Sequence, residues 1–201
     1  MESNSFKRAE NIFHQNNGLL RTGQAKKLGI DEVTLIQMCE KGLLTREAFG
    51  LYRLADLPSL TKPGMVVIAL RVPQAIFCLI SALNFYDLTT QIPYEVYIGL
   101  PKDVKKPRME YPPLNVTYLS EPAYSSGIEQ HIIDEVPVRI YSREKTVADC
   151  FKFRNKIGQD VATEALKDYL RQPGRDIPRL LEFARIDRVE KVIMPYLKAA
   201  L

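Results

Sequence analysis

Two short helical segments separated by one glycine constrain this chain more than any other feature of its sequence. Thr22 is suited to cap a first helix, and Gly29 supplies the left-handed turn that ends it. Asp31 is suited to cap a second helix that runs to Lys41. The pattern therefore predicts a helix-turn-helix near the N-terminus.

The segments on either side complete a larger pattern. Apolar residues recur at helical spacing over residues 6–13, which predicts an amphipathic helix ahead of the pair. Two strand-like runs, 43–46 and 51–54, follow the pair and are joined by a turn at Gly50. A β-hairpin directly after a helix-turn-helix predicts a winged helix-turn-helix domain over residues 1–57.

The second helix of the pair is the candidate for DNA recognition. Leu35, Met38 and Cys39 fall on one face of it, and polar residues fall on the other. The major groove of DNA admits one helix, whose hydroxyl and amide groups can reach base edges, while nearby basic residues contact phosphate. The predicted DNA-binding residues are Thr22, Lys26, Lys27, Glu32, Thr34, Gln37, Lys41, Arg46 and Arg53.

The charge balance predicts that one copy binds DNA weakly. Residues 1–60 contain eight Lys and Arg against seven Asp and Glu, and the whole chain carries a net charge of +4. We therefore expect a homodimer or paired sites on double-stranded DNA. The alternative for this domain is a protein-interaction module whose polar face is only solvated.

A proline-bearing connection over residues 57–64 predicts a domain boundary. After it, Pro73 is expected to open a buried helix that continues to Leu83. β-branched and aromatic residues predict strands, and helical spacing predicts helices after Ser142, which is suited to cap the first of them. The expected strands are 95–100, 114–119, 128–133 and 136–141, and the later helices are 159–171, 177–185 and 187–200.

The expected fold class is therefore α+β. A winged helix-turn-helix is followed by a mixed α/β C-terminal domain over residues 64–201, with a mostly antiparallel sheet and a helical C-terminus. The first residues lack a basic and apolar leader, and no apolar run approaches the roughly 18 residues of a membrane span. We expect a soluble cytoplasmic protein with no membrane partner.

Patterns for catalysis and metal binding are absent from the sequence. His14 and His131 are the only histidines, and neither pairs with a cysteine or an acid at ligand spacing. Cys39, Cys78 and Cys150 are widely separated and are expected to be reduced core residues. Neither a P-loop nor a GxGxxG motif is present. We therefore expect no enzymatic activity, no cofactor and no metal site.

Basic residues cluster in two places of the second domain. They form either a solvated face or a surface for an acidic partner or flanking DNA phosphate, because clustered like charge steers association. The candidate partner-binding residues are Lys102, Lys105, Lys106, Arg108, Arg143, Lys145, Lys152 and Arg154.

Several segments together resemble one family. They are GLLRTGQAKKLGI and GLYRL in the first domain and SALNFYDLTTQIP and VRIYSREKTVADCFKFRNKIG in the second. On these segments, which span nearly the whole chain, the protein is similar to the AbiEi family of type IV antitoxins. That family commonly has glycine at the position of Asp87, so the turn there departs from its pattern.

The resemblance implies a two-part function. The winged helix would repress its own operon at inverted repeats, and the C-terminal domain would counteract a nucleotidyltransferase-type toxin, without needing a stable complex with it. Such toxin-antitoxin systems act by abortive infection in phage defence. The alternative is a stand-alone transcriptional regulator whose C-terminal domain dimerises or senses a ligand.

Overall fold

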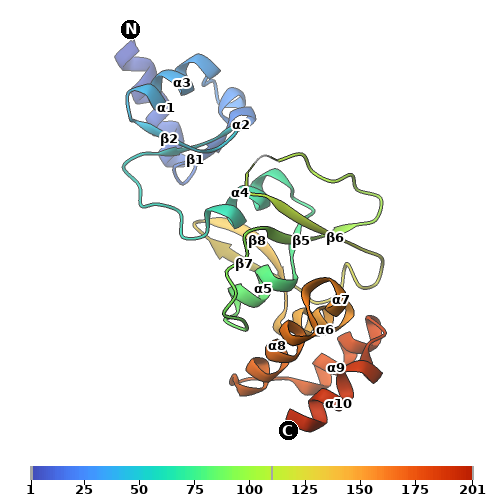
Figure 1. Ribbon diagram of the computed structural model, residues 1–201. Coiled ribbons are helices and arrows are strands. Elements are labelled where there is room, and N and C mark those ends of the chain that lie inside the picture. The colour runs from blue at the N-terminus through green and yellow to red at the C-terminus, as the bar shows by residue number, and fades with distance from the viewer. Residues whose placement is uncertain (1, 110, 201) are drawn as a thin grey trace. The chain divides into compact units, whose positions relative to one another are not determined.

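The computed structural model describes residues 2–109 and 111–200 (Figure 1). The chain divides into two compact units. The first runs through Val67 and includes the short segment Ile133–Glu135, and the second comprises Ile68–Ile132 and the chain from Val136 onward. The division falls inside a helix, α4 (Pro63–Arg71), just after the connection where the sequence predicted a boundary.

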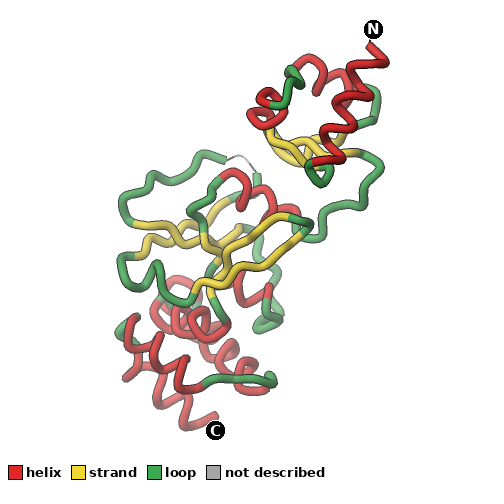
Figure 2. Tube along the Cα trace, turned by 180° about the vertical axis from the view of Figure 1, so that it is seen from behind, coloured by secondary structure: helices red, strands yellow, loops and turns green. Residues whose placement is uncertain are grey.

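The first unit alternates helices with a small sheet. Its strands are arranged in the order β1-β3-β2, with antiparallel pairing on both sides of β3, and Figure 2 shows the helices gathered on one side of this sheet. In chain order the elements are α1 (Glu2–Gln15), β1 (Leu19–Arg21), α2 (Thr22–Lys27), α3 (Glu32–Glu40), β2 (Leu44–Ala48) and β3 (Leu51–Leu54). Three helices and the β2–β3 hairpin match the sequence prediction, whereas β1 was not expected.

The core of the first unit explains why these segments fold as they do. Phe13 of α1 and Leu35 and Met38 of α3 are fully buried in one apolar cluster, as the helical spacing predicted. The Asp31 carboxylate accepts a hydrogen bond at 2.7 Å from the backbone N–H of Thr34, so Asp31 caps α3 as expected. The turn before it places Gly29 at φ +86°, which favours glycine.

The second unit contains a five-stranded sheet with strand order β6-β5-β4-β8-β7. Its strands are β4 (Ile76–Phe77), β5 (Val96–Pro101), β6 (Leu114–Leu119), β7 (Ile128–Ile133) and β8 (Val136–Tyr141). We expected a mostly antiparallel sheet in this part of the chain. β4 pairs with β5 in the antiparallel sense, but β5 pairs with β6 and β4 with β8 in the parallel sense, so this sheet is mixed.

The prediction of a helix from Pro73 to Leu83 is wrong for its first half. Phe77 pairs with Ile98 of β5 and with Ile140 of β8, so β4 lies in the middle of the sheet. The helix α5 begins only at Leu79 and ends at Phe85. A continuous apolar run is compatible with either a buried strand or a buried helix, which is why spacing alone did not separate them.

A cluster of helices follows the sheet (Figure 1). Ser142 caps α6 as predicted, because its hydroxyl accepts the backbone N–H of Lys145 at 3.3 Å. The helices of this cluster are α6 (Arg143–Lys152), α7 (Arg154–Ile157), α8 (Gln159–Arg171), α9 (Ile177–Ile186) and α10 (Glu190–Ala200). Among the described residues, no helix is both long and apolar enough to cross a membrane.

Candidate nucleic-acid interface

The outward face of α3 differs from the one that the sequence predicted. Val33 and Ile36, which are 62% and 48% exposed, form its centre together with the exposed Glu40. Thr34 and Gln37 were expected on the exposed polar face, but both are half-buried. The helical spacing contained the signal, because Val33 and Ile36 lie opposite the buried pair Leu35 and Met38.

One flank of α3 carries an ion pair. Lys26 Nζ of α2 lies 2.8 Å from the Glu32 carboxylate, and both side chains are about half exposed. The hydrogen bond and charge of Lys26 lower the pKa of Glu32, and the charge of Arg46 lowers it further. Arg46 is exposed on β2 and lies within electrostatic reach of α3. Lys27 is also exposed on α2.

The tip of the β2–β3 hairpin combines a cation with an aromatic ring. The guanidinium of Arg46 lies 4.9 Å from the centre of the Phe49 ring, which is 72% exposed. Gly50 forms the turn at φ +72°, and its carbonyl accepts the backbone N–H of Thr22 at 2.9 Å. The hairpin is therefore fixed to the first residue of α2, and Thr22 itself is half-buried.

Arg53 does not occupy the position that the sequence predicted. It is only 7% exposed, and its guanidinium lies 2.5 Å from the Glu47 carboxylate. It also donates to the carbonyls of Leu54, Leu57 and Pro58 at 2.6–3.1 Å. These bonds fasten the chain that leaves β3, so Arg53 is a structural residue and not a phosphate contact. All four residues of β3 are buried, so the strand has no solvated face.

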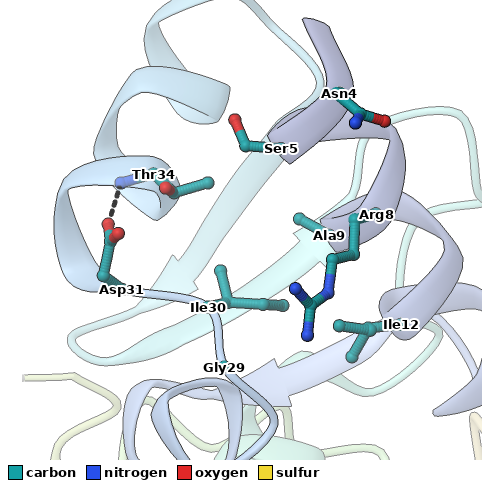
Figure 3. A pocket seen from close by; sticks show the side chains of 9 residues that line it. All are labelled: Asn4, Ser5, Arg8, Ala9, Ile12, Gly29, Ile30, Asp31 and Thr34. Carbon is teal, nitrogen blue, oxygen red and sulfur yellow. Dashed lines mark hydrogen bonds between the residues drawn. The ribbon is translucent and has the colours of Figure 1, made fainter. Parts of the chain in front are cut away.

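The other flank of α3 faces α1 across a cavity of about 250 Å³ (Figure 3). Arg8 extends from α1 toward Gly29, and Asp31 and Thr34 contribute the α3 side of the cavity. Lys41, at the end of α3, lies over the Phe6 ring with its Nζ 4.7 Å from the ring centre. The cavity is lined by Asn4, Ser5, Arg8, Ala9, Ile12, Gly29, Ile30, Asp31 and Thr34.

The basic residues of the second unit separate into two groups. Lys102, Lys105, Lys106 and Arg108 are all exposed in the loop between β5 and β6, which agrees with a solvated or partner-binding surface. The candidates on α6 and α7 are engaged within the fold, and Lys145 is buried, so the prediction of a surface residue is wrong for Lys145; Arg143, Lys152 and Arg154 stay partly exposed. Their engaged members are Arg143, Lys145, Lys152 and Arg154.

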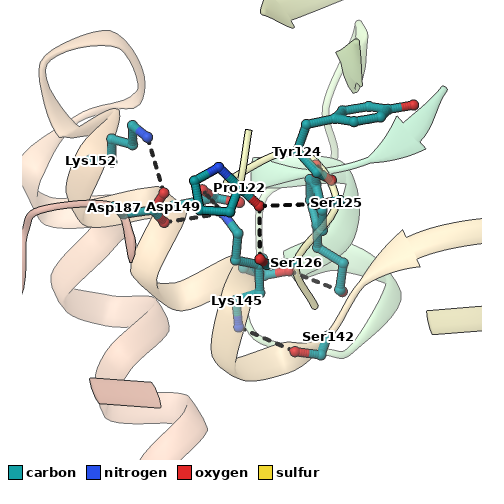
Figure 4. Close-up of polar contacts among 11 residues, drawn as sticks. Pro122, Tyr124, Ser125, Ser126, Ser142, Lys145, Asp149, Lys152 and Asp187 are labelled. Atoms are coloured by element: carbon teal, nitrogen blue, oxygen red, sulfur yellow. Dashed lines mark hydrogen bonds and ion pairs between the residues drawn. The ribbon is translucent and has the colours of Figure 1, made fainter. Parts of the chain in front are cut away.

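Lys145 is the clearest example of a basic residue engaged within the fold, because its side chain is fully buried. Its Nζ lies 2.5 Å from Asp149 Oδ1 and 3.1 Å from Asp187 Oδ2, and Lys152 Nζ lies 3.0 Å from Asp187 Oδ1 (Figure 4). Burial opposes the charged form of Lys145, but the two carboxylates outweigh it and raise its pKa. The two lysines and two aspartates join α6 to the connection before α10.

The carboxyl group of Asp149 is only partly hydrogen-bonded. Burial raises the pKa of its carboxyl to about 8, against the opposing charge of Lys145. Its second oxygen, Oδ2, is buried and has no hydrogen-bond partner in the described structure. Arg143 donates to the carbonyls of Pro173 and Gly174 at 3.3 Å, and Arg154 to that of Phe151 at 2.8 Å, so these residues also fasten the helices.

One polar cluster was missed by the sequence reasoning. The Tyr86 hydroxyl donates to Glu129 at 3.0 Å and lies 3.2 Å from His131 Nε2, which is itself 3.5 Å from Glu129. We expected no acid beside His131, although alternation along β7 places Glu129 on the same face. Within the described part of the chain, no group of three His, Cys, Asp or Glu residues is placed to hold a metal ion.

The cysteines are not paired. Cys78 and Cys150 are buried, Cys39 is half-buried, and all three are free thiols, as the sequence predicted. Burial raises the pKa of Cys78 and Cys150, so these thiols are poor nucleophiles.

Comparison with solved structures finds a similar fold in the RV2827C protein from Mycobacterium tuberculosis. The TM-score is 0.58 at 10% sequence identity, and the match covers 97% of this chain and 81% of that one. At this identity the likeness is one of fold alone. No protein-family model and no curated protein sequence matches the chain.

Proposed function

We propose that this protein is a DNA-binding transcriptional repressor whose first unit is a winged helix-turn-helix. One observation carries the proposal: α3 follows α2 after a tight turn, the β2–β3 hairpin follows α3, and the outward face of α3 is uncovered within this unit. Helix-turn-helix proteins insert the second helix of the pair into the major groove. A protein of this kind works in the cytoplasm, so this location belongs to the proposal.

The cations beside α3 supply the attraction to DNA. Three exposed cations on α2 and β2 are suited to phosphate contacts: Lys26, Lys27 and Arg46. Arg53 is buried and is not counted among them. Glu32 and Glu40 are exposed on α3 itself and oppose the attraction. The carboxylates of Glu32 and Glu40 offset part of the charge of these cations and give weak binding per copy, so we propose that two copies bind inverted repeats together.

We further propose that the second unit gives the protein its antitoxin activity, as the AbiEi resemblance implies. Of the segments that carry this resemblance, YSREKTVADC contains the last residue of β8 and most of α6, and its Lys145, Thr146 and Asp149 are buried. This segment therefore supports a similar fold and contributes little surface to a partner. The exposed cations of the β5–β6 loop are the better candidates for the surface that counteracts a nucleotidyltransferase-type toxin.

The alternative function is a stand-alone regulator whose second unit dimerises or senses a ligand. The Tyr86–Glu129–His131 cluster is the observation that favours it, because these polar groups are partly exposed and lie within 3.5 Å of one another. A neighbouring gene for a nucleotidyltransferase, and protection of cells from its product, would decide for the antitoxin.

Binding of the full chain to a random-sequence DNA duplex, followed by fluorescence anisotropy over a range of salt concentrations, tests the DNA-binding proposal. The triple variant Lys26→Ala, Lys27→Ala and Arg46→Ala should weaken binding to all sequences and reduce the salt slope by about two units, one each for Lys27 and Arg46, because Lys26 is paired with Glu32. Lys191→Ala removes an exposed cation from α10 and should leave binding unchanged. Equal binding by the triple variant and the wild type would contradict the proposal.

A further inference from the structure

Two aliphatic side chains stand at the centre of the face that α3 presents. Val33 and Ile36 are three residues apart, so they lie next to each other on the helix surface. Both are largely exposed. Both are also β-branched, which keeps each side chain close to one rotamer and makes the exposed patch a defined shape. Two adjacent aliphatic side chains of this kind offer a small apolar surface that can contact an apolar group of a partner.

The charged residues around this patch restrict what the partner can be. Lys26 and Arg46 lie along one flank of α3, near Glu32, and Lys41 lies at the end of the helix on the side of α1. Glu32 pairs with Lys26, and Glu40 is exposed on the same face, but the cations lie on both sides of the patch and suit a partner that combines a small apolar group with negative charge on either side of it. The major groove of duplex DNA has this combination, since thymine presents a C5 methyl group between two lines of phosphates.

We infer that Val33 and Ile36 contact the C5 methyl groups of thymines, so that the protein selects DNA sites containing A·T pairs under α3. The inference rests on the proposed DNA-binding function and adds to it the chemical group that is recognised. Neither side chain can donate or accept a hydrogen bond, so neither distinguishes guanine, adenine or cytosine by the edges of those bases. The methyl group is the apolar feature of the major-groove base edges.

A second copy of this chain fits the patch less well. A stable protein interface buries about 800 Å² on each partner, far more than two aliphatic side chains expose. The patch therefore favours DNA over self-association.

The test compares thymine with deoxyuridine, which lacks only the C5 methyl group. A random-core duplex library is enriched for binding to the full chain, and the selected duplex is then made with thymine or with deoxyuridine at every thymine position. The wild type should bind the deoxyuridine duplex about threefold to fivefold more weakly for each methyl group contacted. Because no substitution is made in the protein, this result does not depend on the folding of a variant.

Two variants locate the effect. Val33→Ala with Ile36→Ala should bind the thymine and deoxyuridine duplexes equally, because the side chains that contact the methyl groups are shortened. Ile132→Ala shortens a similarly exposed side chain on β7 and should keep the wild-type ratio. Both variants are checked for the wild-type circular dichroism spectrum and melting temperature.

The outcomes separate this inference from the proposed function. Equal affinity of the wild type for the two duplexes, with DNA binding intact, overturns the inference and leaves the function standing. Loss of self-association in the Val33→Ala, Ile36→Ala variant, with an unchanged thymine-to-deoxyuridine ratio, also overturns it and assigns the patch to a second copy. Failure of the wild type to bind any duplex overturns the proposed function together with the inference.

Discussion

The ammonium of Lys26 lies 2.8 Å from the carboxylate of Glu32, and this ion pair joins α2 to α3 across the turn at Gly29. Both partners are about half exposed, so the pair contributes little to folding. The pair does, however, place the negative charge of Glu32 beside Lys26, one of the cations proposed to contact phosphate. We therefore expect Glu32 to restrain the proposed DNA binding.

Glu32→Gln is expected to increase affinity for DNA of any sequence several-fold, because it removes this negative charge and releases Lys26. The salt slope should steepen by up to about one unit as Lys26 gains a phosphate contact. Anisotropy titrations at several salt concentrations measure both effects. Glu164→Gln, on the exposed face of α8, is the matched control and should change neither. Weaker binding by Glu32→Gln would mean that Glu32 itself contacts the DNA.

Arg46→Ala and Arg53→Ala should separate binding from folding. Arg53 is buried against Glu47 and three carbonyls, so its removal should lower the free energy of unfolding by about 3–5 kcal/mol. Arg46 is exposed, and its removal should weaken DNA binding with little change in stability. Urea denaturation measures the first effect and anisotropy the second. A stable Arg53→Ala variant that binds DNA poorly would instead indicate that Arg53 contacts the DNA.

The two faces of α3 give a second paired prediction. Leu35→Ala should destabilise the first unit by about 2–5 kcal/mol, because it opens a cavity in the core around Phe13 and Met38. Ile36→Ala should change stability much less, since Ile36 is about half exposed. Thermal unfolding of the two variants compares them directly. Similar losses from both would show that α3 is rotated from the position described above.

Asp149 predicts a pH dependence of stability. Its folded-state pKa is raised to about 8 by burial, above its value in the unfolded chain, so the folded state binds the extra proton between about pH 4 and pH 8. The stabilisation that this carboxyl gives the folded state is therefore fully present below about pH 4 and is lost as the pH rises to about 8. The difference in unfolding free energy between the wild type and Asp149→Asn should fall over that interval. A difference in unfolding free energy that does not change with pH would contradict the raised pKa of Asp149.

The exposed loop between β5 and β6 can be tested for a role in the proposed antitoxin activity. Lys105→Glu with Lys106→Glu should reduce protection of cells from the toxin of the same operon, because it reverses charge on the candidate surface. DNA binding and melting temperature should be retained. Lys191→Glu with Lys198→Glu changes two exposed lysines of α10 and serves as the control. Full protection by the loop variant would remove this loop from the proposed surface.

The sequence predicted those elements whose signals are local. The Asp31 cap and the burial of Leu35 and Met38 follow from residues within a few positions of one another, and so does the Ser142 cap. The strand β4 was missed because Ile76 and Phe77 are placed by partners on β5 and β8, far away in the sequence. Its two residues are too few to show alternation.

The candidate site was predicted less well for the same reason. Nothing near Arg53 in the sequence shows that the chain after β3 folds back to accept its guanidinium. Lys145 likewise appears as one more cation of a basic helix until Asp187, 42 residues later, is brought against it. The direction in which a long basic side chain points depends on such distant partners.

Hydrogen-deuterium exchange of the full chain, with and without a saturating amount of a selected DNA duplex, tests the central claim most directly. Binding through the winged helix predicts slower exchange of backbone amides in α2, α3 and the β2–β3 hairpin, with exchange in α8 to α10 unchanged. Slower exchange confined to the second unit, or no change anywhere while DNA is bound, would contradict the assignment of α3 as the helix that enters the major groove.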